Sequence, residues 1–362
     1  MRIAYLIRLD TSKESGVLKK ILSQSKKWIE HGNHVKCIFV TPNNNNLPII
    51  EKSLGNNFQI IHKPSKLSAH FFNNREIYNA VIEFKPDIIY HRFTKYFPWL
   101  RKIIKNNYII LEINSYDLGE FKKNSSFKEH IKYAYHKISR KFVLGNSDGM
   151  VAVSNELKDM YSIYGKPIQV VSNGIDLTDF EPIPSPNNKK PNLLFIGSPN
   201  QCWHGLDKIE HVATAFPEWS FDIVGITEQQ YGGNNNSNMY FHGYLCKMEY
   251  CKLMNTADCA IGTLALHRIN IKEVSPLKLR EYLAYGIPTI IGYKDPDFPY
   301  TVPFILELPC EENNVKDNLE RIFEFVTASK GKRVPRNEIK HIDSDIKERQ
   351  RLAFFESIIK KS

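Results

Sequence analysis

Two glutamates and a lysine in one stretch of the chain have the types and spacing that a phosphate-containing ligand requires. The stretch runs from Glu273 to Ile290 (EVSPLKLREYLAYGIPTI). Ser275 and Pro276 predict a helix start, with the serine as N-cap and the proline as first helical residue, and Gly286 predicts the end. The first turn of a helix presents unpaired N–H groups and the positive end of the helix dipole, so it can bind an anion.

The side chains of this helix suit different parts of such a ligand. The N–H groups of Leu277 and Lys278, with the Lys278 ammonium, suit a diphosphate leaving group. Glu281 lies about one turn beyond Lys278, and one carboxylate can accept hydrogen bonds from both ribose hydroxyls. Glu273 precedes the helix, where it could approach the donor sugar. The alternative is that Glu281 pairs with a neighbouring cation on a solvated face and Glu273 is an ordinary loop residue.

Alternating strand and helix patterns must position these residues. Apolar runs followed by amphipathic stretches predict a parallel sheet in the first half of the chain. A run of Pro, Asn and Lys at 181–191 predicts a linker, after which a second alternation begins. We therefore expect an α/β protein with two Rossmann-like domains facing a cleft. Residues 1–180 form the N-terminal domain, residues 192–337 the C-terminal domain, and residues 338–362 a helix that crosses back to the first domain.

Ligands of open parallel sheets bind at the carboxyl ends of the strands, so the expected strands decide where a site can lie. In the first half of the chain the expected strands are residues 3–9, 35–40, 58–62, 87–91, 108–113 and 149–153. In the second half they are residues 192–196, 221–224, 239–241, 259–261 and 289–291.

Several segments resemble glycosyltransferase family 4, and they follow one another in that family's order. Two glutamates separated by seven residues and followed by LAYGIPTI are similar to its donor-binding signature. VVSNGIDLTDFEP, DIIYHRF, IILEINSYDLGE and GMVAVSNEL resemble segments of its first domain. The resemblance implies the GT-B fold, retention of anomeric configuration, and catalysis without a metal ion or other cofactor. It also implies that the C-terminal domain binds a nucleotide-sugar co-substrate, with Glu273 as the catalytic residue and Glu281 as a donor-binding residue.

The chain departs from the family in the loop after strand 192–196. Family members have Gly-Arg there and Lys-Gly a few residues later, a cationic pair that holds the diphosphate. This chain has FIGSPNQCWHGLDKI, with Gly197 and Ser198 at the first position and His204 before the second glycine. Ser198 could donate from its hydroxyl, and His204 could supply an N–H or a positive charge. Lys278 would then supply more of the positive charge that holds the diphosphate. The alternative is a structural histidine.

Residues of the N-terminal domain are expected to complete the site. Gly16 and Val17 follow the first strand, where the family has a glycine loop whose N–H groups approach the donor. The alternative is a plain helix-starting turn. Asn114 and Glu120 follow strand 108–113 and are expected to contact the acceptor or the sugar.

Composition limits the partners and the compartment. The formal net charge of +10 favours attraction to phosphates on a nucleotide, a nucleic acid or an anionic membrane. The opening MRIAYLIRLD becomes charged too early for a signal peptide, and no apolar run is long enough to span a bilayer, so we expect a cytoplasmic protein. The six scattered cysteines predict reduced thiols rather than a zinc or redox centre.

A helix expected over residues 127–142 carries Lys128, Lys132, His136 and Arg140 on one face, beside an apolar stripe. A charged stripe of this kind is usually a solvated face. Lys128, Lys132 and Arg140 would also suit peripheral contact with the inner face of the cell membrane, because each cation near an anionic surface contributes roughly 1 kcal/mol.

The sequence therefore predicts a retaining, metal-independent hexosyltransferase. Its donor is expected to be a UDP- or GDP-sugar and its acceptor a saccharide or lipid-linked saccharide, in surface polysaccharide assembly. One alternative is a sugar-nucleotide 2-epimerase on the same architecture. Another is a non-catalytic module that binds phosphate or nucleic acid, although no nucleic-acid motif accompanies the basic residues.

Overall fold

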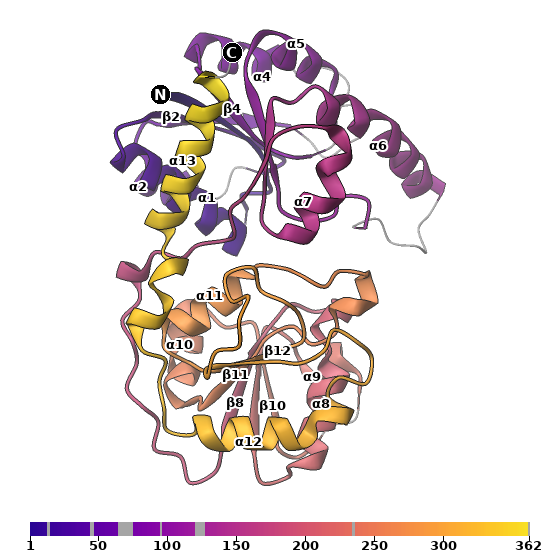
Figure 1. The fold of residues 1–362 in the computed structure, drawn as a ribbon, viewed down its shortest axis with the longest axis vertical. Helices are drawn as coiled ribbons and strands as arrows, with labels where there is room; N and C mark the ends of the chain where they lie inside the picture. Colours follow the sequence, from indigo (N-terminus) through magenta and orange to yellow (C-terminus); the bar gives the residue numbers. More distant parts are fainter. Residues whose placement is uncertain are drawn as a thin grey trace. The chain divides into compact units, whose positions relative to one another are not determined.

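The computed structural model describes residues 1–12, 15–43, 47–63, 75–94, 96–119, 127–233 and 236–360. The chain forms two compact units (Figure 1). The first comprises Met1–Ser172 together with Ser344–Ser362, and the second comprises Asn173–Asp343. The chain therefore leaves the first unit once, completes the second, and returns to the first for its last helix.

The first unit is built on a seven-stranded parallel sheet in the order β3-β2-β1-β4-β5-β6-β7. Its strands are β1 (Arg2–Arg8), β2 (His34–Thr41), β3 (Phe58–His62), β4 (Ile88–Arg92), β5 (Ile109–Ile113), β6 (Gly149–Ala152) and β7 (Ile168–Val170). The strand order reverses between β1 and β4, which is the topological switch point of a doubly wound sheet. Residues Ile3–Ile7 of β1 are all buried, as a strand covered on both faces requires.

Helices cover both faces of this sheet. They are α1 (Gly16–Glu30), α2 (Leu47–Leu54), α4 (Arg75–Phe84), α5 (Pro98–Asn106), α6 (Phe127–Gly145), α7 (Asn155–Tyr161), the 3₁₀ helix η1 (Ser162–Tyr164) and α13 (Ser344–Lys360). One apolar core lies between the sheet and α4, α5, α6 and α7, and the other lies between the sheet and α1, α2 and α13. The indole Nε1 of Trp28 donates to Glu348 Oε2 at 2.8 Å, which fixes α13 against α1 (Figure 1).

The second unit is built on a six-stranded parallel sheet in the order β10-β9-β8-β11-β12-β13. Its strands are β8 (Asn192–Ile196), β9 (Ser220–Val224), β10 (Met239–Gly243), β11 (Cys259–Ile261), β12 (Thr289–Ile291) and β13 (Ile305–Glu307). Its α-helices are α8 (Leu206–Ala215), α9 (Glu228–Tyr231), α10 (Lys247–Thr256), α11 (Leu277–Ala284) and α12 (Leu319–Ser329). The 3₁₀ helices are η2 (Leu177–Asp179), η3 (Cys202–His204), η4 (Leu266–Ile269), η5 (Lys316–Asn318) and η6 (Arg336–Ile342). The order reverses between β8 and β11.

The expected α/β class with two parallel-sheet units is confirmed, and all eleven expected strands are present with ends that differ by at most two residues. The sequence missed β7 and β13, each of which is three residues long and lies at a sheet edge. β7 has no fully buried residue, so it lacks the apolar pattern by which the other strands are identified.

The boundary between the units lies at Ser172/Asn173, before the position expected from the sequence. The segment expected to be a linker packs on the second unit instead. The N–H of Ile183 donates to the Tyr285 carbonyl at 3.3 Å, and Arg333 Nε donates to the Pro184 carbonyl at 3.2 Å. The expected C-terminal helix is divided at Asp343, so that η6 belongs to the second unit and α13 to the first.

Candidate functional site

The carboxyl ends of β8, β11 and β12 bring most of the predicted residues of the second unit together. The loop after β8 is tied to the segment after β11, because Leu264 N–H donates to the His204 carbonyl at 3.2 Å. Backbone bonds between residues 272–274 and Lys294 hold half-buried Glu273 beside the end of β12. The switch point of this unit therefore carries the predicted loop and the start of α11.

Glycine is required at the start of this loop for steric reasons. A Cβ on Gly197 would lie 2.5 Å from Cε1 of Phe195 and 3.0 Å from Cδ2 of His204. Gly225, at φ +87°, could not carry a Cβ either, because that atom would lie 2.0 Å from the Gly197 carbonyl oxygen. The loops after β8 and β9 therefore approach each other at backbone distance.

His204 holds this loop through its ring. Its Nε2 accepts a hydrogen bond from the N–H of Ser198 at 3.2 Å, and its ring lies edge-on to Phe195 with centroids 5.3 Å apart. Burial, reinforced by the nearby Lys278, lowers the pKa of His204 to about 3. The imidazole is therefore neutral with its proton on Nδ1, because Nε2 accepts. The positive charge allowed for His204 by the sequence is absent, and Ser198, which is exposed, contacts the ring through its backbone N–H.

Lys278 lies between His204 and Phe195. Its Nζ is 3.5 Å from His204 Nδ1 and 4.6 Å from the centroid of the Phe195 ring. Burial lowers the pKa of Lys278 to about 7, since removing an ammonium from water disfavours its charge. An anion bound here would reverse this effect and stabilise the ammonium. Lys278 is thus the side chain in this loop region that can supply a positive charge on binding a ligand.

The two predicted glutamates lie on either side of the start of α11. Tyr250 donates from its hydroxyl to Oε1 of Glu281 at 2.9 Å. A carboxylate offers about four acceptor positions, so this one bond leaves capacity for ligand hydroxyls. The partner is a tyrosine rather than the neighbouring cation that the alternative interpretation required.

Helix α11 begins at Leu277, with Pro276 as its N-cap residue, so the expected serine cap is wrong. The Ser275 hydroxyl instead accepts from the N–H of Asn173 and from Nη2 of Arg280, both at 2.9 Å. These contacts occupy the oxygen that would have capped the helix. The first turn of α11 keeps the N–H groups of Leu277 and Lys278 at the site edge.

Two buried side chains that sequence reasoning missed fix α11 in place. Arg280 is fully buried and makes two hydrogen bonds to Asp295, at 2.9 and 2.8 Å, and one to Asp297 at 2.7 Å. Tyr282 accepts from the N–H of Ile196, the last residue of β8, at 2.9 Å. The helix that carries Lys278 and Glu281 is therefore fastened to both β8 and the loop after β12.

In the first unit, Ser15 caps α1 by accepting from the N–H of Leu18 at 3.2 Å, so exposed Gly16 and half-buried Val17 form the first turn. Lys20, one turn further, donates to Glu112 at 2.8 Å and to Asn114 at 2.7 Å. The side chain of Asn114 is therefore engaged with α1.

Burial opposes the charge of Glu112, but Lys20 and Arg92 hold the pKa of Glu112 far below its ordinary value. Sequence reasoning missed Lys20 and Glu112, since only tertiary contact joins them. Glu120 lies outside the described residues.

The basic face expected on α6 is wrong for Arg140 and His136. Both are buried, and both bind Asp117: Arg140 through Nε at 2.6 Å and Nη2 at 2.7 Å, and His136 through Nε2 at 2.6 Å. Burial opposes the charge of Asp117, but hydrogen bonds from His136, Arg140 and Tyr161 outweigh it and lower the pKa of Asp117 to about 2. The exposed residues at this end of α6 include Ile138, an expected member of the apolar stripe.

For the other predicted membrane contacts, the backbone of Lys128 is described without its side chain, and Lys132 is half-buried. Among the described helices, none is long and apolar enough to cross a membrane.

Residues 16–179 match Glycosyltransferase Family 4, a span that covers most of the first unit and a little under half of the chain. The match ends before α11, so it is independent of the glutamate pair. A search of curated proteins gave no sequence match.

Solved structures share the fold over nearly the whole chain. The apo form of the lipopolysaccharide outer core galactosyltransferase WaaB is 15% identical, with a TM-score of 0.68 over 99% of this chain and 100% of its own. A glycosyltransferase from Rickettsia africae is 14% identical, with a TM-score of 0.68 over 100% and 99%. Alr3699/HepE of Anabaena, in complex with UDP-glucose, is 12% identical, with a TM-score of 0.65 over 99% and 100%.

These findings identify the class of protein. The first unit matches glycosyltransferase family 4 over most of its length, and the whole chain has the GT-B fold. The expected resemblance is confirmed, and the chain is a glycosyltransferase.

Proposed function

We propose that this glycosyltransferase binds a nucleotide diphosphate sugar in its second unit and transfers the sugar with retention of configuration. The observation that carries the proposal is that α11, with Lys278 and Glu281, is held beside β8 and the loop that follows it, and that Glu273 lies just before this helix. The fold of the chain is shared with a protein whose structure holds UDP-glucose, which supports a UDP-sugar as the first donor to test. A GDP-sugar is the second.

The diphosphate is the part of the donor that the proposal explains best. The N–H groups of Leu277 and Lys278 lie in the first turn of α11, where an anion gains from the helix dipole. The Lys278 ammonium adds a charge-assisted hydrogen bond. His204 acts through Ser198 and Lys278, because it is neutral and buried between them. In the proposal, this arrangement takes the place of the Arg/Lys pair that family members have and that this chain lacks.

The two carboxylates take different roles in the proposal. Glu281 accepts from the ribose hydroxyls while Tyr250 holds its other oxygen. Glu273 positions the donor sugar and supports its partial positive charge. The bond between the anomeric carbon and the phosphate oxygen breaks as the acceptor oxygen bonds to that carbon from the same face. The acceptor proton passes to the departing phosphate, so no enzyme nucleophile or metal ion is needed.

The acceptor is proposed to be a saccharide or lipid-linked saccharide in surface polysaccharide assembly, bound by the first unit in the cytoplasm. Gly16 and Val17 at the start of α1 would approach the donor, and Asn114 the acceptor. Any contact with an anionic membrane would involve Lys132 rather than Arg140, because Arg140 is bound to Asp117.

The test is binding and slow hydrolysis of a panel of UDP- and GDP-sugars by the whole protein with EDTA present. We expect one sugar nucleotide to bind, with weaker binding by Lys278→Ala and Glu281→Ala and unchanged binding by Lys252→Ala, an exposed lysine on α10. The anomeric configuration of the released or transferred sugar, measured by NMR, tests retention. Binding of no sugar nucleotide, or loss of activity in EDTA that Mg²⁺ restores, would contradict the proposal.

A sugar-nucleotide 2-epimerase is the competing function for the same donor site. It would convert the donor to its 2-epimer with no acceptor present, and NMR of the nucleotide sugar would detect that product directly. Accumulation of the epimer without release of nucleoside diphosphate would replace the transferase proposal.

A further inference from the structure

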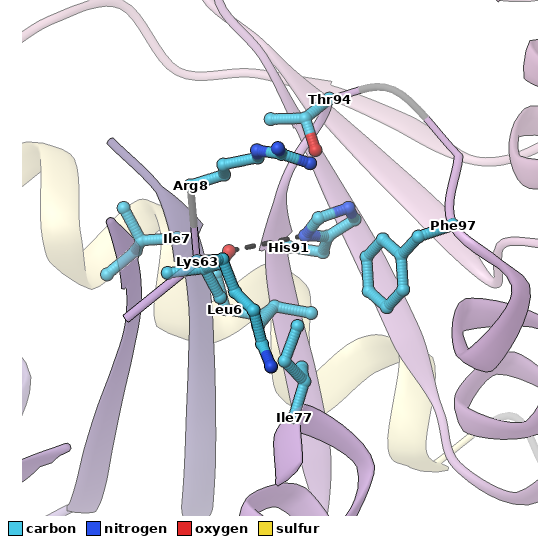
Figure 2. Close-up of a pocket in the computed structure, with 9 residues that line it drawn as sticks. Leu6, Ile7, Arg8, Lys63, Ile77, His91, Thr94 and Phe97 are labelled. Carbon is cyan, nitrogen blue, oxygen red and sulfur yellow. Dashed lines mark hydrogen bonds between the residues drawn. The ribbon is translucent and has the colours of Figure 1, made fainter. Parts of the chain in front are cut away.

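The first unit contains a small hollow of its own at the carboxyl ends of β1 and β4, which is the switch point of its sheet (Figure 2). Its lining is mostly apolar, with a few polar groups among the apolar side chains. Arg8 closes β1, His91 lies near the end of β4, and Thr94 follows β4. Ligands of doubly wound sheets bind at such a position, outside the carboxyl ends of the strands. All the residues that line the hollow belong to the first unit.

His91 faces the hollow with an unused acceptor. Its Nδ1 lies 3.2 Å from the Leu6 carbonyl oxygen, which can only accept, so Nδ1 carries the proton. Burial lowers the pKa of His91 to about 4, so the ring is neutral and Nε2 has a lone pair. His91 is 1% exposed, and Nε2 has no hydrogen-bond partner among the described residues. A buried acceptor without a partner costs free energy, so this atom calls for a ligand group or a water.

Two further polar groups face the same space. The Thr94 hydroxyl also lacks a hydrogen-bond partner within the described part of the chain. In Figure 2 the guanidinium of Arg8 reaches across the hollow toward Thr94, on the side of the His91 ring that carries Nε2. The guanidinium of Arg8 is partly removed from water, and this burial lowers its pKa from the ordinary value.

The surrounding charges argue against a simple anion site. Lys63 also lines the hollow, but its Nζ is 3.2 Å from Glu76 Oε2. Asp10 joins Arg8 and Lys63 around an adjoining hollow of about 160 Å³. Positive and negative groups therefore accompany each other, and the hollow offers both donors and acceptors.

The chemistry selects the group that fits. A carboxylate or a dianionic phosphate has no hydrogen for Nε2 of His91, and an ammonium would be repelled by the Arg8 guanidinium. A hydroxyl fits, because it donates to Nε2 and tolerates the neighbouring guanidinium as an acceptor, and Thr94 can bond it in either direction. The candidates are a water molecule and a hydroxyl of a larger ligand that displaces it.

We infer that this hollow binds one hydroxyl of the acceptor saccharide, with Arg8, His91 and Thr94 as the residues that select it. The inference rests on the proposed transferase function and gives that function its acceptor subsite. In the absence of acceptor, one water takes the hydroxyl's place. Loss of a single sugar hydroxyl then leaves buried groups unpaired, which makes the site selective for it.

The experiment measures binding of methyl glycosides to the full chain by saturation-transfer NMR and titration. Probes are the methyl glycosides of glucose, galactose, mannose and N-acetylglucosamine, and then each monodeoxy analogue of the one that binds best. We expect one deoxy position to weaken binding to the wild type about 10- to 100-fold, the usual range for an unpaired buried polar group. Thr94→Val and Arg8→Met should bind the parent glycoside more weakly and lose the discrimination at that position.

Arg101→Met, which removes an exposed arginine of α5 in the same unit, is the matched control and should keep the discrimination. Thr94→Val preserves side-chain shape, so it remains informative if Arg8→Met does not fold. Equal discrimination by the wild type and Thr94→Val would overturn the inference, as would the absence of any glycoside binding to the wild type. UDP-sugar binding, measured on the same samples, reports separately on the donor site and therefore on the proposed function.

Discussion

Each unit has a buried histidine beside the switch point of its sheet, His91 within β4 and His204 in the loop after β8, yet the two rings are used differently. In the second unit, His204 accepts from Ser198 through Nε2, while Nδ1 faces Lys278. In the first unit, His91 donates from Nδ1 to Leu6 and keeps Nε2 for the hollow. Burial keeps both rings neutral. The difference shows that the neighbours of a buried histidine decide which of its ring nitrogens is left to face a ligand.

The largest expected effect is on the stability of the second unit, where a buried ion cluster of Arg280, Asp295 and Asp297 holds α11 in place. Arg280→Met leaves Asp295 and Asp297 buried without their partner, which we expect to cost about 3–5 kcal/mol of unfolding free energy. Hydrogen exchange resolved by peptide should show faster exchange in the second unit and unchanged exchange in the first. Arg321→Met, an exposed arginine on α12, is the control. Equal loss of protection in both units would show that the units do not respond separately.

The next effect tests whether the switch point of the second unit binds charge. Lys278→Met removes its ammonium, and we expect kcat/KM for the donor to fall about 10²- to 10³-fold, as for loss of one group that stabilises developing negative charge. Steady-state kinetics with the best donor measures this, with Lys252→Met as the charge-matched control. A decrease below fivefold would mean that the diphosphate is held elsewhere.

A smaller effect is expected on nucleotide affinity, and it distinguishes recognition of the ribose from recognition of the diphosphate. Glu281→Gln keeps the shape and the Tyr250 contact but removes the charge, so the affinity for UDP should fall about 10- to 100-fold, the usual value for hydrogen bonds to a charged group. Inorganic pyrophosphate should bind equally to the variant and the wild type. If both ligands lose affinity together, Glu281 does not recognise the ribose.

The smallest expected effect is a pH dependence of the affinity for UDP, which arises from Lys278 in the second unit. Lys278 has a pKa of about 7 without ligand, and a bound diphosphate should raise it. Below pH 7 the ammonium is already formed and the affinity for UDP is at its maximum. Above pH 7 binding must take up a proton, so affinity should fall by up to about tenfold per pH unit.

Lys278→Arg stays protonated throughout the range and provides the control for this pH dependence. Titration calorimetry in two buffers of different ionisation enthalpy should detect uptake approaching one proton at pH 8 in the wild type and none in the variant. His204, with a pKa of about 3, does not titrate in this range. Equal slopes of affinity against pH in both proteins would assign the proton to another group.

The sequence by itself determined the parallel sheets, because their central strands are apolar runs buried on both faces, a pattern visible without any partner. It also placed Lys278, Glu281 and Glu273 around one helix start, since helical spacing is local. The edge strands β7 and β13 escaped because a three-residue strand with partial burial has little pattern of its own.

The tertiary structure decided everything that depends on a distant partner. Ser275 bonds Asn173, 102 residues away, instead of capping its helix, and Arg140 is buried because Asp117, 23 residues earlier in the chain, lies beside it. The charge states of His204, Lys278 and His91 follow from burial, which no local pattern encodes. Spacing along the chain therefore selected the residues of the proposed donor site, while desolvation and long-range hydrogen bonds set what each of them can do.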